Sequence, residues 1–86
     1  VEVEYIGNGK GEVQGLKNEY NFGESVLLQA EVQAADQSIF MGWLDENGSI
    51  SWDDQFIIEK LETKRSLKAV FELATIENIL RKRYAQ

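Results

Sequence analysis

Apolar and polar residues alternate along most of the chain, from the first residue to about residue 73. The breaks in this alternation are rich in Gly, Asn and Asp, the residue types that favour tight turns. A period of two residues with such breaks is typical of short antiparallel strands. We expect strands over residues 1–6, 12–16, 25–33, 39–45, 56–59 and 66–73.

Two of the breaks predict hairpins. The segment 7–11, Gly-Asn-Gly-Lys-Gly, lies between the first two expected strands, and glycine tolerates the positive φ of tight turns. We therefore expect these two strands to pair with each other. Asn47-Gly48 follows the most apolar stretch of the chain and predicts that the strand over 39–45 also turns back on itself.

The most apolar strand carries two large aromatic residues, Phe40 and Trp43, three positions apart. A regular strand would place them on opposite faces. Gly42 permits a β-bulge that turns both inward, and a buried indole then needs an acceptor for its N–H. The expected core comprises Val3, Val26, Leu28, Ala30, Phe40, Trp43, Ile58, Ala69 and Phe71.

From Thr75 the spacing of apolar residues changes to that of a helix. Thr75 is the expected N-cap of a helix of about ten residues, a length that is marginal in isolation. We expect its apolar stripe to lie on the domain's own sheet, and docking of a partner is the alternative. The stripe comprises Ile76, Ile79, Leu80 and Tyr84.

The 86 residues suffice for one domain with one modest core. We expect a mainly β fold, α+β by count, in the form of a small antiparallel module of about five to six strands with one short C-terminal helix. The pattern does not choose between a β-grasp-like and a sandwich-like arrangement. The β domain should cover residues 1–73, and 74–86 should form the helix or a linker to a following segment.

Charge and hydropathy narrow the choice of partners. The net charge is −6, with residues 1–63 carrying 3 basic and 13 acidic side chains and 64–86 carrying 6 and 2. An acidic body repels nucleic-acid phosphate, so nucleic acid is not an expected partner. No apolar run reaches the ~20 residues that span a bilayer, so membrane insertion is not expected either.

The chain starts at Val1 with no export signal. We expect it to be part of a larger protein and to be monomeric.

The chain contains no histidine, which is the commonest general base, and no cysteine, which is the thiol nucleophile. It therefore also lacks the usual nitrogen and sulfur ligands of metal ions. We therefore expect no enzyme activity, no cofactor and no metal. Carboxylates of Asp45-Glu46-Asn47 and Asp53-Asp54 offer calcium as an alternative, although their spacing does not match an EF-hand. Turns stabilised by Asp side chains explain the same residues more simply.

Trp52, Asp53 and Asp54 are the candidate ligand contacts. Ile50 and Trp52, then Phe56 and Ile58, suggest a strand that is interrupted around Asp53-Asp54, so Trp52 should lie beside a turn. An indole in such a place can stack on a sugar ring. Packing in the core or at a sheet edge is the more ordinary use of an aromatic residue in a small β domain.

Four segments give the chain a resemblance to a known family. They are Gly9-Lys10-Gly11-Glu12-Val13, Tyr20-Asn21-Phe22-Gly23-Glu24-Ser25-Val26-Leu27-Leu28-Gln29-Ala30, Phe40-Met41-Gly42-Trp43 and Leu67-Lys68-Ala69-Val70-Phe71. Their order and spacing resemble the divergent internalin-type B-repeat over roughly residues 3 to 72. The family usually has Gly or Pro before the Phe-x-Gly-Trp strand, where this chain has residues 34–38, Ala-Ala-Asp-Gln-Ser, and the tail from Thr75 lies outside the repeat.

The resemblance implies a module of bacterial surface or secreted proteins, often present in tandem and without an active site. The expected function is therefore that of a non-catalytic structural or spacer repeat, at the cell surface or outside the cell, whose partners are neighbouring domains of the same chain. The alternative is a recognition module that binds a host protein or a glycan through a sheet edge or exposed aromatics, with Trp52 foremost.

Overall fold

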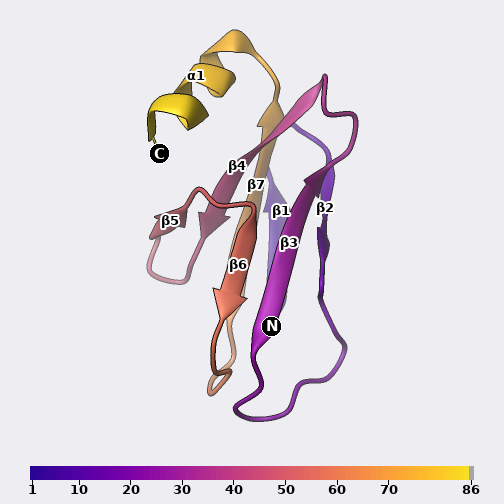
Figure 1. The fold of residues 1–86 in the computed structure, drawn as a ribbon, viewed down its shortest axis with the longest axis vertical. Helices are drawn as coiled ribbons and strands as arrows, with labels where there is room; N and C mark the ends of the chain where they lie inside the picture. Colours follow the sequence, from indigo (N-terminus) through magenta and orange to yellow (C-terminus); the bar gives the residue numbers. More distant parts are fainter. Residues whose placement is uncertain (86) are drawn as a thin grey trace.

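A computed structural model describes residues 1–85 of the chain, which form seven strands and one helix (Figure 1). The fold is mainly β, as the alternation predicts. The elements are β1 (Glu2–Ile6), β2 (Gly11–Gln14), β3 (Val26–Val32), β4 (Ser38–Leu44), β5 (Ile50–Ser51), β6 (Gln55–Ile58), β7 (Ser66–Leu73) and α1 (Ile76–Ala85).

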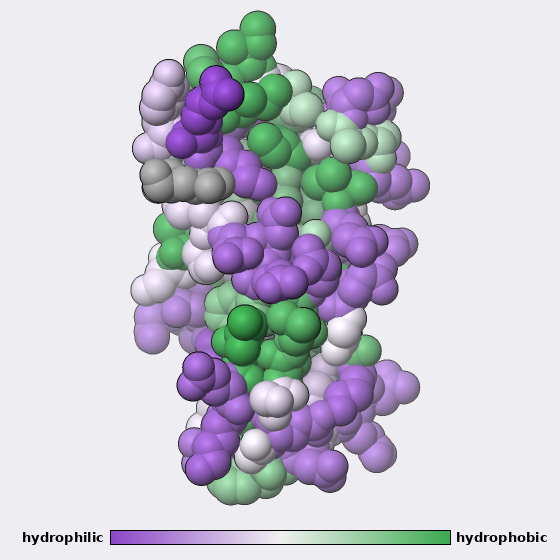
Figure 2. Space-filling model, viewed as in Figure 1, coloured by the Kyte–Doolittle hydropathy of each residue, from purple (hydrophilic) through white to green (hydrophobic). Residues whose placement is uncertain are grey.

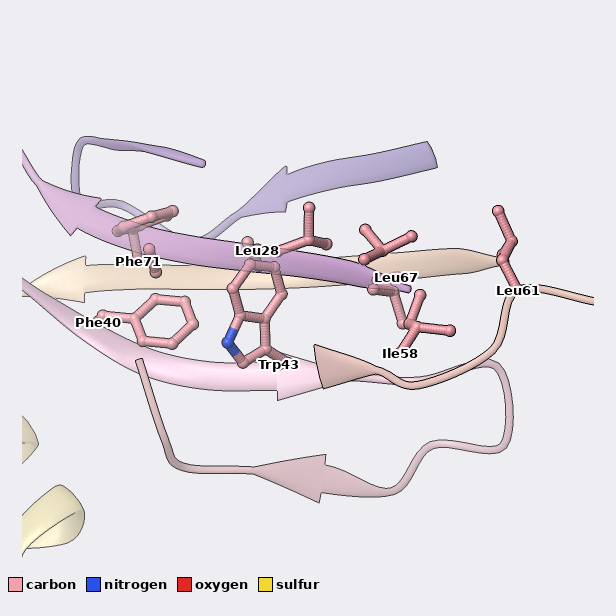
Figure 3. Packing of buried hydrophobic residues seen from close by; sticks show 10 residues of the cluster. Leu28, Phe40, Trp43, Ile58, Leu61, Leu67 and Phe71 are labelled. Atoms are coloured by element: carbon pink, nitrogen blue, oxygen red, sulfur yellow. The ribbon is translucent and has the colours of Figure 1, made fainter. Parts of the chain in front are cut away.

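The strands form two sheets that pack face to face as a small sandwich. One sheet has four strands in the order β1-β7-β4-β5, and the other has three in the order β2-β3-β6. Side chains from both sheets meet between the layers, where Figure 3 shows Leu28 and Ile58 of one sheet near Phe40, Trp43, Leu67 and Phe71 of the other. Of the two arrangements that the pattern left open, the structure has the sandwich.

The pairing of β1 differs from the sequence-based expectation. β1 lies parallel to β7, with Glu2 opposite Ser66 and Ile6 opposite Val70, while β2 pairs with β3 in the other sheet. The expected hairpin of the first two strands is therefore wrong, and one strand pair is not antiparallel. After β1 the chain continues along β7, where the Gly9 amide donates to the Phe71 carbonyl at 2.9 Å, and it then crosses to the other sheet, in which β2 begins at Gly11.

The predicted core is confirmed except at one position. Val3 is half-buried at the margin of the core, because β1 is an edge strand. Leu61 and Leu67 are buried core residues that were not predicted. Leu67 continues the alternation of Ala69 and Phe71 on β7, whereas Leu61 lies in the irregular segment between β6 and β7, where no period reveals it.

The bulge predicted at Gly42 is confirmed. The pairing of β4 with β7 shifts register between Phe40 and Trp43, and Gly42 has a φ of 109°. Both aromatic side chains therefore point into the core, where their ring centroids lie 5.3 Å apart. The indole N–H of Trp43 donates to the Asp53 carbonyl at 3.0 Å, which supplies the acceptor that the sequence required.

The turn between β4 and β5 is the second predicted hairpin, and it is confirmed. An oxygen of the Asp45 carboxylate accepts the amides of Asn47 and Ser49, each at 2.9 Å. This is the turn chemistry expected of an Asp side chain between two strands. β5 itself has only two residues and was not predicted as a separate strand.

The helix begins where the change of period places it. The Thr75 hydroxyl accepts the Asn78 amide at 3.1 Å, which makes Thr75 the N-cap. α1 lies beside β4, yet its described residues include no buried side chain, and Ile76 and Tyr84 are 78% and 79% exposed. The expectation that the apolar stripe lies on the domain's own sheet is therefore wrong.

Within residues 1–85 no helix is long and apolar enough to cross a bilayer.

Candidate functional site

A hollow of about 460 Å³ lies between the β5–β6 connection and α1. Its lining includes Trp52, Asp53 and Asp54, the three candidate ligand contacts, which the structure brings together. Lys82 of α1 joins them from the other side. Sequence reasoning missed Lys82, because only the placement of the helix against β4 brings it to this loop.

The backbone beneath the hollow is held to the core at two points. The Asp53 carbonyl accepts the Trp43 indole N–H, and the Asp54 carbonyl accepts the Ala30 amide at 2.8 Å. The Asp53 carboxylate also accepts the Gln55 amide at 3.0 Å, closing a local turn. Since Trp43 and Ala30 are buried, the loop that carries Trp52 is fixed by residues of the core.

Two of the three charged side chains of the hollow, those of Lys82 and Asp54, are paired across it. The Lys82 ammonium lies 3.4 Å from the Asp54 carboxylate and 5.7 Å from the centre of the Phe40 ring. Asp53 and Asp54 are exposed, and Trp52 is half-buried. The hollow thus presents an indole, two carboxylates and one ammonium, which can stack on a ring and exchange hydrogen bonds with hydroxyl groups.

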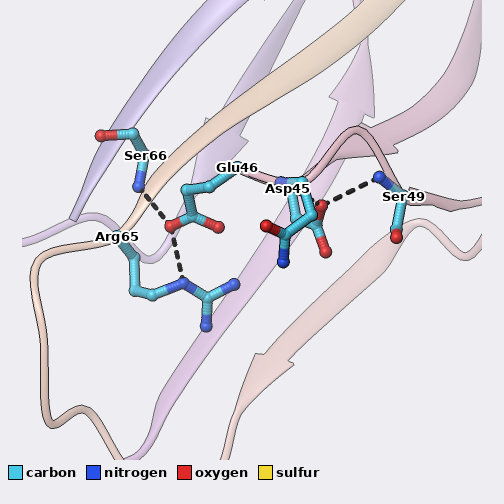
Figure 4. Close-up of polar contacts among 6 residues, drawn as sticks. Asp45, Glu46, Ser49, Arg65 and Ser66 are labelled. Carbon is cyan, nitrogen blue, oxygen red and sulfur yellow. Dashed lines mark hydrogen bonds and ion pairs between the residues drawn. The ribbon is translucent and has the colours of Figure 1, made fainter.

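The carboxylates considered for calcium are divided between separate tasks. Asp45 stabilises the β4–β5 turn, while Glu46 pairs with Arg65, Oε2 to Nε at 2.8 Å, and accepts the Ser66 amide at 2.8 Å (Figure 4). These two donors lower the pKa of Glu46 from 4.5 to about 2, the Arg65 hydrogen bond having the larger effect. In the part of the chain that the structure describes, no three His, Cys, Asp or Glu side chains gather as a metal site would require.

A second ion pair stabilises the long connection between β2 and β3. Lys17 pairs with Glu24, whose carboxylate also accepts the Asn21 amide at 2.8 Å. Both contacts lower the pKa of Glu24, the Lys17 hydrogen bond first. These groups hold a loop and are not directed into the hollow beside α1.

Two exposed apolar surfaces were not predicted as candidates. Phe22 is 80% exposed beside a hollow of about 300 Å³ that Tyr20 and Leu61 also line. On the outer face of the three-stranded sheet, Leu27 of β3 pairs with Ile57 of β6, and they are 52% and 62% exposed. Figure 2 shows apolar surface among hydrophilic residues over these two strands.

Comparison with models of protein families, with curated proteins and with solved structures finds no match to the chain. The resemblance to the internalin-type B-repeat therefore stays a prediction.

Proposed function

We propose that this domain is a non-catalytic spacer module of a larger bacterial protein, secreted or held at the cell surface. One observation carries the proposal: β1 and β7 are parallel, so the first strand starts towards one end of the long axis and the last strand finishes towards the other. A domain of this kind separates the start of its first strand from the end of its last strand by about the length of β7.

The parallel pairing of β1 and β7 is the cause of this geometry. Both strands run from the same end of the sandwich towards the same opposite end, so Glu2 lies beside Ser66 and far from Leu73 (Figure 1). The domain measures 42 × 22 × 15 Å. A polypeptide that enters at β1 and leaves at β7 therefore runs parallel to the longest dimension over the eight residues of β7 before α1 begins.

The chemistry of the side chains favours a structural role. The chain has neither histidine nor cysteine, and Asp45, Glu46, Asp53 and Asp54 are engaged in turns and ion pairs. The four motifs that resemble the B-repeat family suggest the same role. That family also supplies the proposed location outside the cell and the neighbouring domains as partners.

Small-angle X-ray scattering of one, two and three fused copies of the chain tests the spacer role. If each copy adds length, the maximum dimension should grow in near-equal steps, each shorter than the 42 Å long axis. Fused copies that fold back on one another would instead form a compact particle, whose maximum dimension grows by smaller and smaller steps as copies are added. That second outcome would refute the proposal.

The second candidate function is recognition of a glycan in the hollow of Trp52, Asp53, Asp54 and Lys82. The specific observation in its favour is that these four side chains surround one hollow of about 460 Å³. An indole beside hydrogen-bonding carboxylates suits a polyhydroxylated ring. The loop is held by the core, so little conformational freedom would be lost on binding.

Titration with neutral oligosaccharides, followed by NMR of the amides and indoles, tests this second candidate. Binding should shift the Trp52 indole signal and leave the buried Trp43 signal in place. The Trp52→Ala variant should abolish the shifts, while Trp52→Phe should retain part of the affinity because a ring remains. Signals that stay unmoved in the presence of every sugar would remove this candidate.

A further inference from the structure

We infer that β1 and β7 form a mechanical clamp that resists tension applied along the chain. The clamp comprises the segment 2–9 and the segment 65–71, which lie side by side. This inference rests on the proposed spacer function, because only a module joined at both ends is pulled in this direction.

The hydrogen bonds between the two segments extend beyond the strands themselves. At the start of β1, the Glu2 amide donates to the Arg65 carbonyl at 2.9 Å, and past its end the Gly9 amide donates to the Phe71 carbonyl at 2.9 Å. Between these points the strands are in register from Glu2 opposite Ser66 to Ile6 opposite Val70. The clamp therefore covers most of the length of β7.

The parallel direction decides how a force acts on these bonds. Tension that pulls Val1 one way and the end of β7 the other slides the two strands past each other. The hydrogen bonds lie across the strands, so sliding strains all of them together. If the two strands were pulled apart from one end, the bonds would instead break in turn, each at a small force.

Packing prevents β7 from sliding freely. β7 lies between β1 and β4, and its side chains Leu67, Ala69 and Phe71 are buried in the core. The rings of Tyr5 and Phe71 meet edge to face at 5.9 Å, and the Tyr5 hydroxyl accepts the Val13 amide at 2.9 Å. Displacement of β1 along β7 would therefore disturb the core and the contact with the opposite sheet.

The helix lies outside the clamp on the C-terminal side. No side chain among its described residues is buried, and Lys82 is its one charged contact with the loop at Asp54. Under tension α1 should extend first and at low force, because it is short and packs weakly. The clamp then remains as the main barrier to unfolding.

Single-molecule force spectroscopy can test the clamp in two pulling directions on the same folded chain. The chain has no cysteine, so introduced cysteines are unique attachment points. The pair Val1→Cys and Ala74→Cys applies shear, whereas Val1→Cys and Thr63→Cys separates β1 from β7 starting at one end. We expect the rupture force in shear to exceed the other by at least about twofold at equal loading rate, since forced unfolding follows the unfolding barrier. Equal rupture forces in the two pulling directions would refute the proposed clamp.

A matched pair of variants tests the hydrogen bonds themselves. Amides two residues apart on a strand face the same neighbour, so Glu4, like Glu2, directs its amide towards β7. Glu4→Pro removes this donor and should lower the rupture force in shear, whereas Glu4→Ala keeps the amide and should leave it near the wild-type value. Equal forces for the two variants would contradict the proposal. If Glu4→Pro fails to fold, the comparison of pulling directions still decides.

The scattering and force experiments fail independently. Fused copies that form a rod but rupture equally in both directions would keep the spacer function and refute the clamp. Fused copies that fold back on one another while one copy resists shear would refute the spacer function and retain the mechanical property.

Discussion

Phe40 and Trp43 meet edge to face inside the sandwich, with ring centroids 5.3 Å apart and ring planes inclined at 67°. Two residues three positions apart share a face only because the bulge at Gly42 adds a residue to β4. The same bulge directs the Trp43 indole to the Asp53 carbonyl. One backbone irregularity therefore fixes both the aromatic core and the loop of the candidate site.

Replacement of Gly42 by Ala should destabilise the domain by about 3 kcal/mol or more, from backbone strain and steric clash together. Gly42 has a φ of 109°, and an added Cβ would lie 2.7 Å from the Ser51 carbonyl oxygen. Urea denaturation followed by circular dichroism measures the loss. Gly48→Ala is the control: its φ is 80° with no atom within 4 Å of the added Cβ, so the cost should be about 1 kcal/mol. Similar losses for both variants would show that the bulge is dispensable.

The Trp43→Phe variant should lose about 2–4 kcal/mol of stability, because it leaves a cavity and removes the donor to the Asp53 carbonyl. Chemical denaturation gives the value. Trp52→Phe serves as the matched change on a half-buried residue, and it should change stability by less than about 0.5 kcal/mol. A loss at Trp52 as large as that at Trp43 would contradict the assignment of Trp43 to the core.

Stability should fall as the pH is lowered from about 5 towards 2, in part through Glu46. Its pKa is about 2 in the folded protein against an ordinary value of 4.5, so its contribution is present above 4.5 and is lost as the pH falls towards 2. The pair with Arg65 is partly exposed to solvent, so the contribution should be about 1 kcal/mol or less. Denaturation midpoints across this pH range should depend less on pH in Glu46→Gln. An unchanged slope would refute the role of Glu46.

Removal of residues 75–86 should cost about 1 kcal/mol or less, because no described side chain of the helix is buried and Lys82 makes only an ion pair with the exposed Asp54 and a contact with the Phe40 ring. Thermal denaturation of the shortened chain measures this cost. Lys82→Met keeps the aliphatic stem and removes the charge, so it should account for most of the same loss. A shortened chain that no longer folds would mean that the helix is part of the domain's core structure.

The sequence predicts where strands lie better than how they pair. Alternation with a period of two is the same in parallel and antiparallel strands, so it locates β1 and β7 without revealing that they are neighbours. The glycines after β1 suggested a local hairpin, yet they serve a crossing to the other sheet in which Gly9 follows Phe71. The bulge at Gly42 was predictable, because Phe40 and Trp43 both need to be buried and a glycine that permits an irregular backbone lies between them.

The candidate site was predictable in part. Trp52, Asp53 and Asp54 are adjacent in the chain, so any turn there brings them together. Lys82 comes from a helix whose position depends on the orientation of the chain after β7, and no local pattern specifies that. Leu61 escaped prediction for a similar reason, since an irregular segment buries it without any period.

The pairing of β1 with β7 also has a consequence for biosynthesis. Among residues 1–85, a ribosome makes β1 before the other six strands, but the only neighbour of β1 in the sheet is β7, the last of these strands to be made. Until β7 emerges, Val3 and Tyr5 have no sheet in which to pack, and closing so long a loop slows folding. The nascent domain therefore stays open until its final strand has been made.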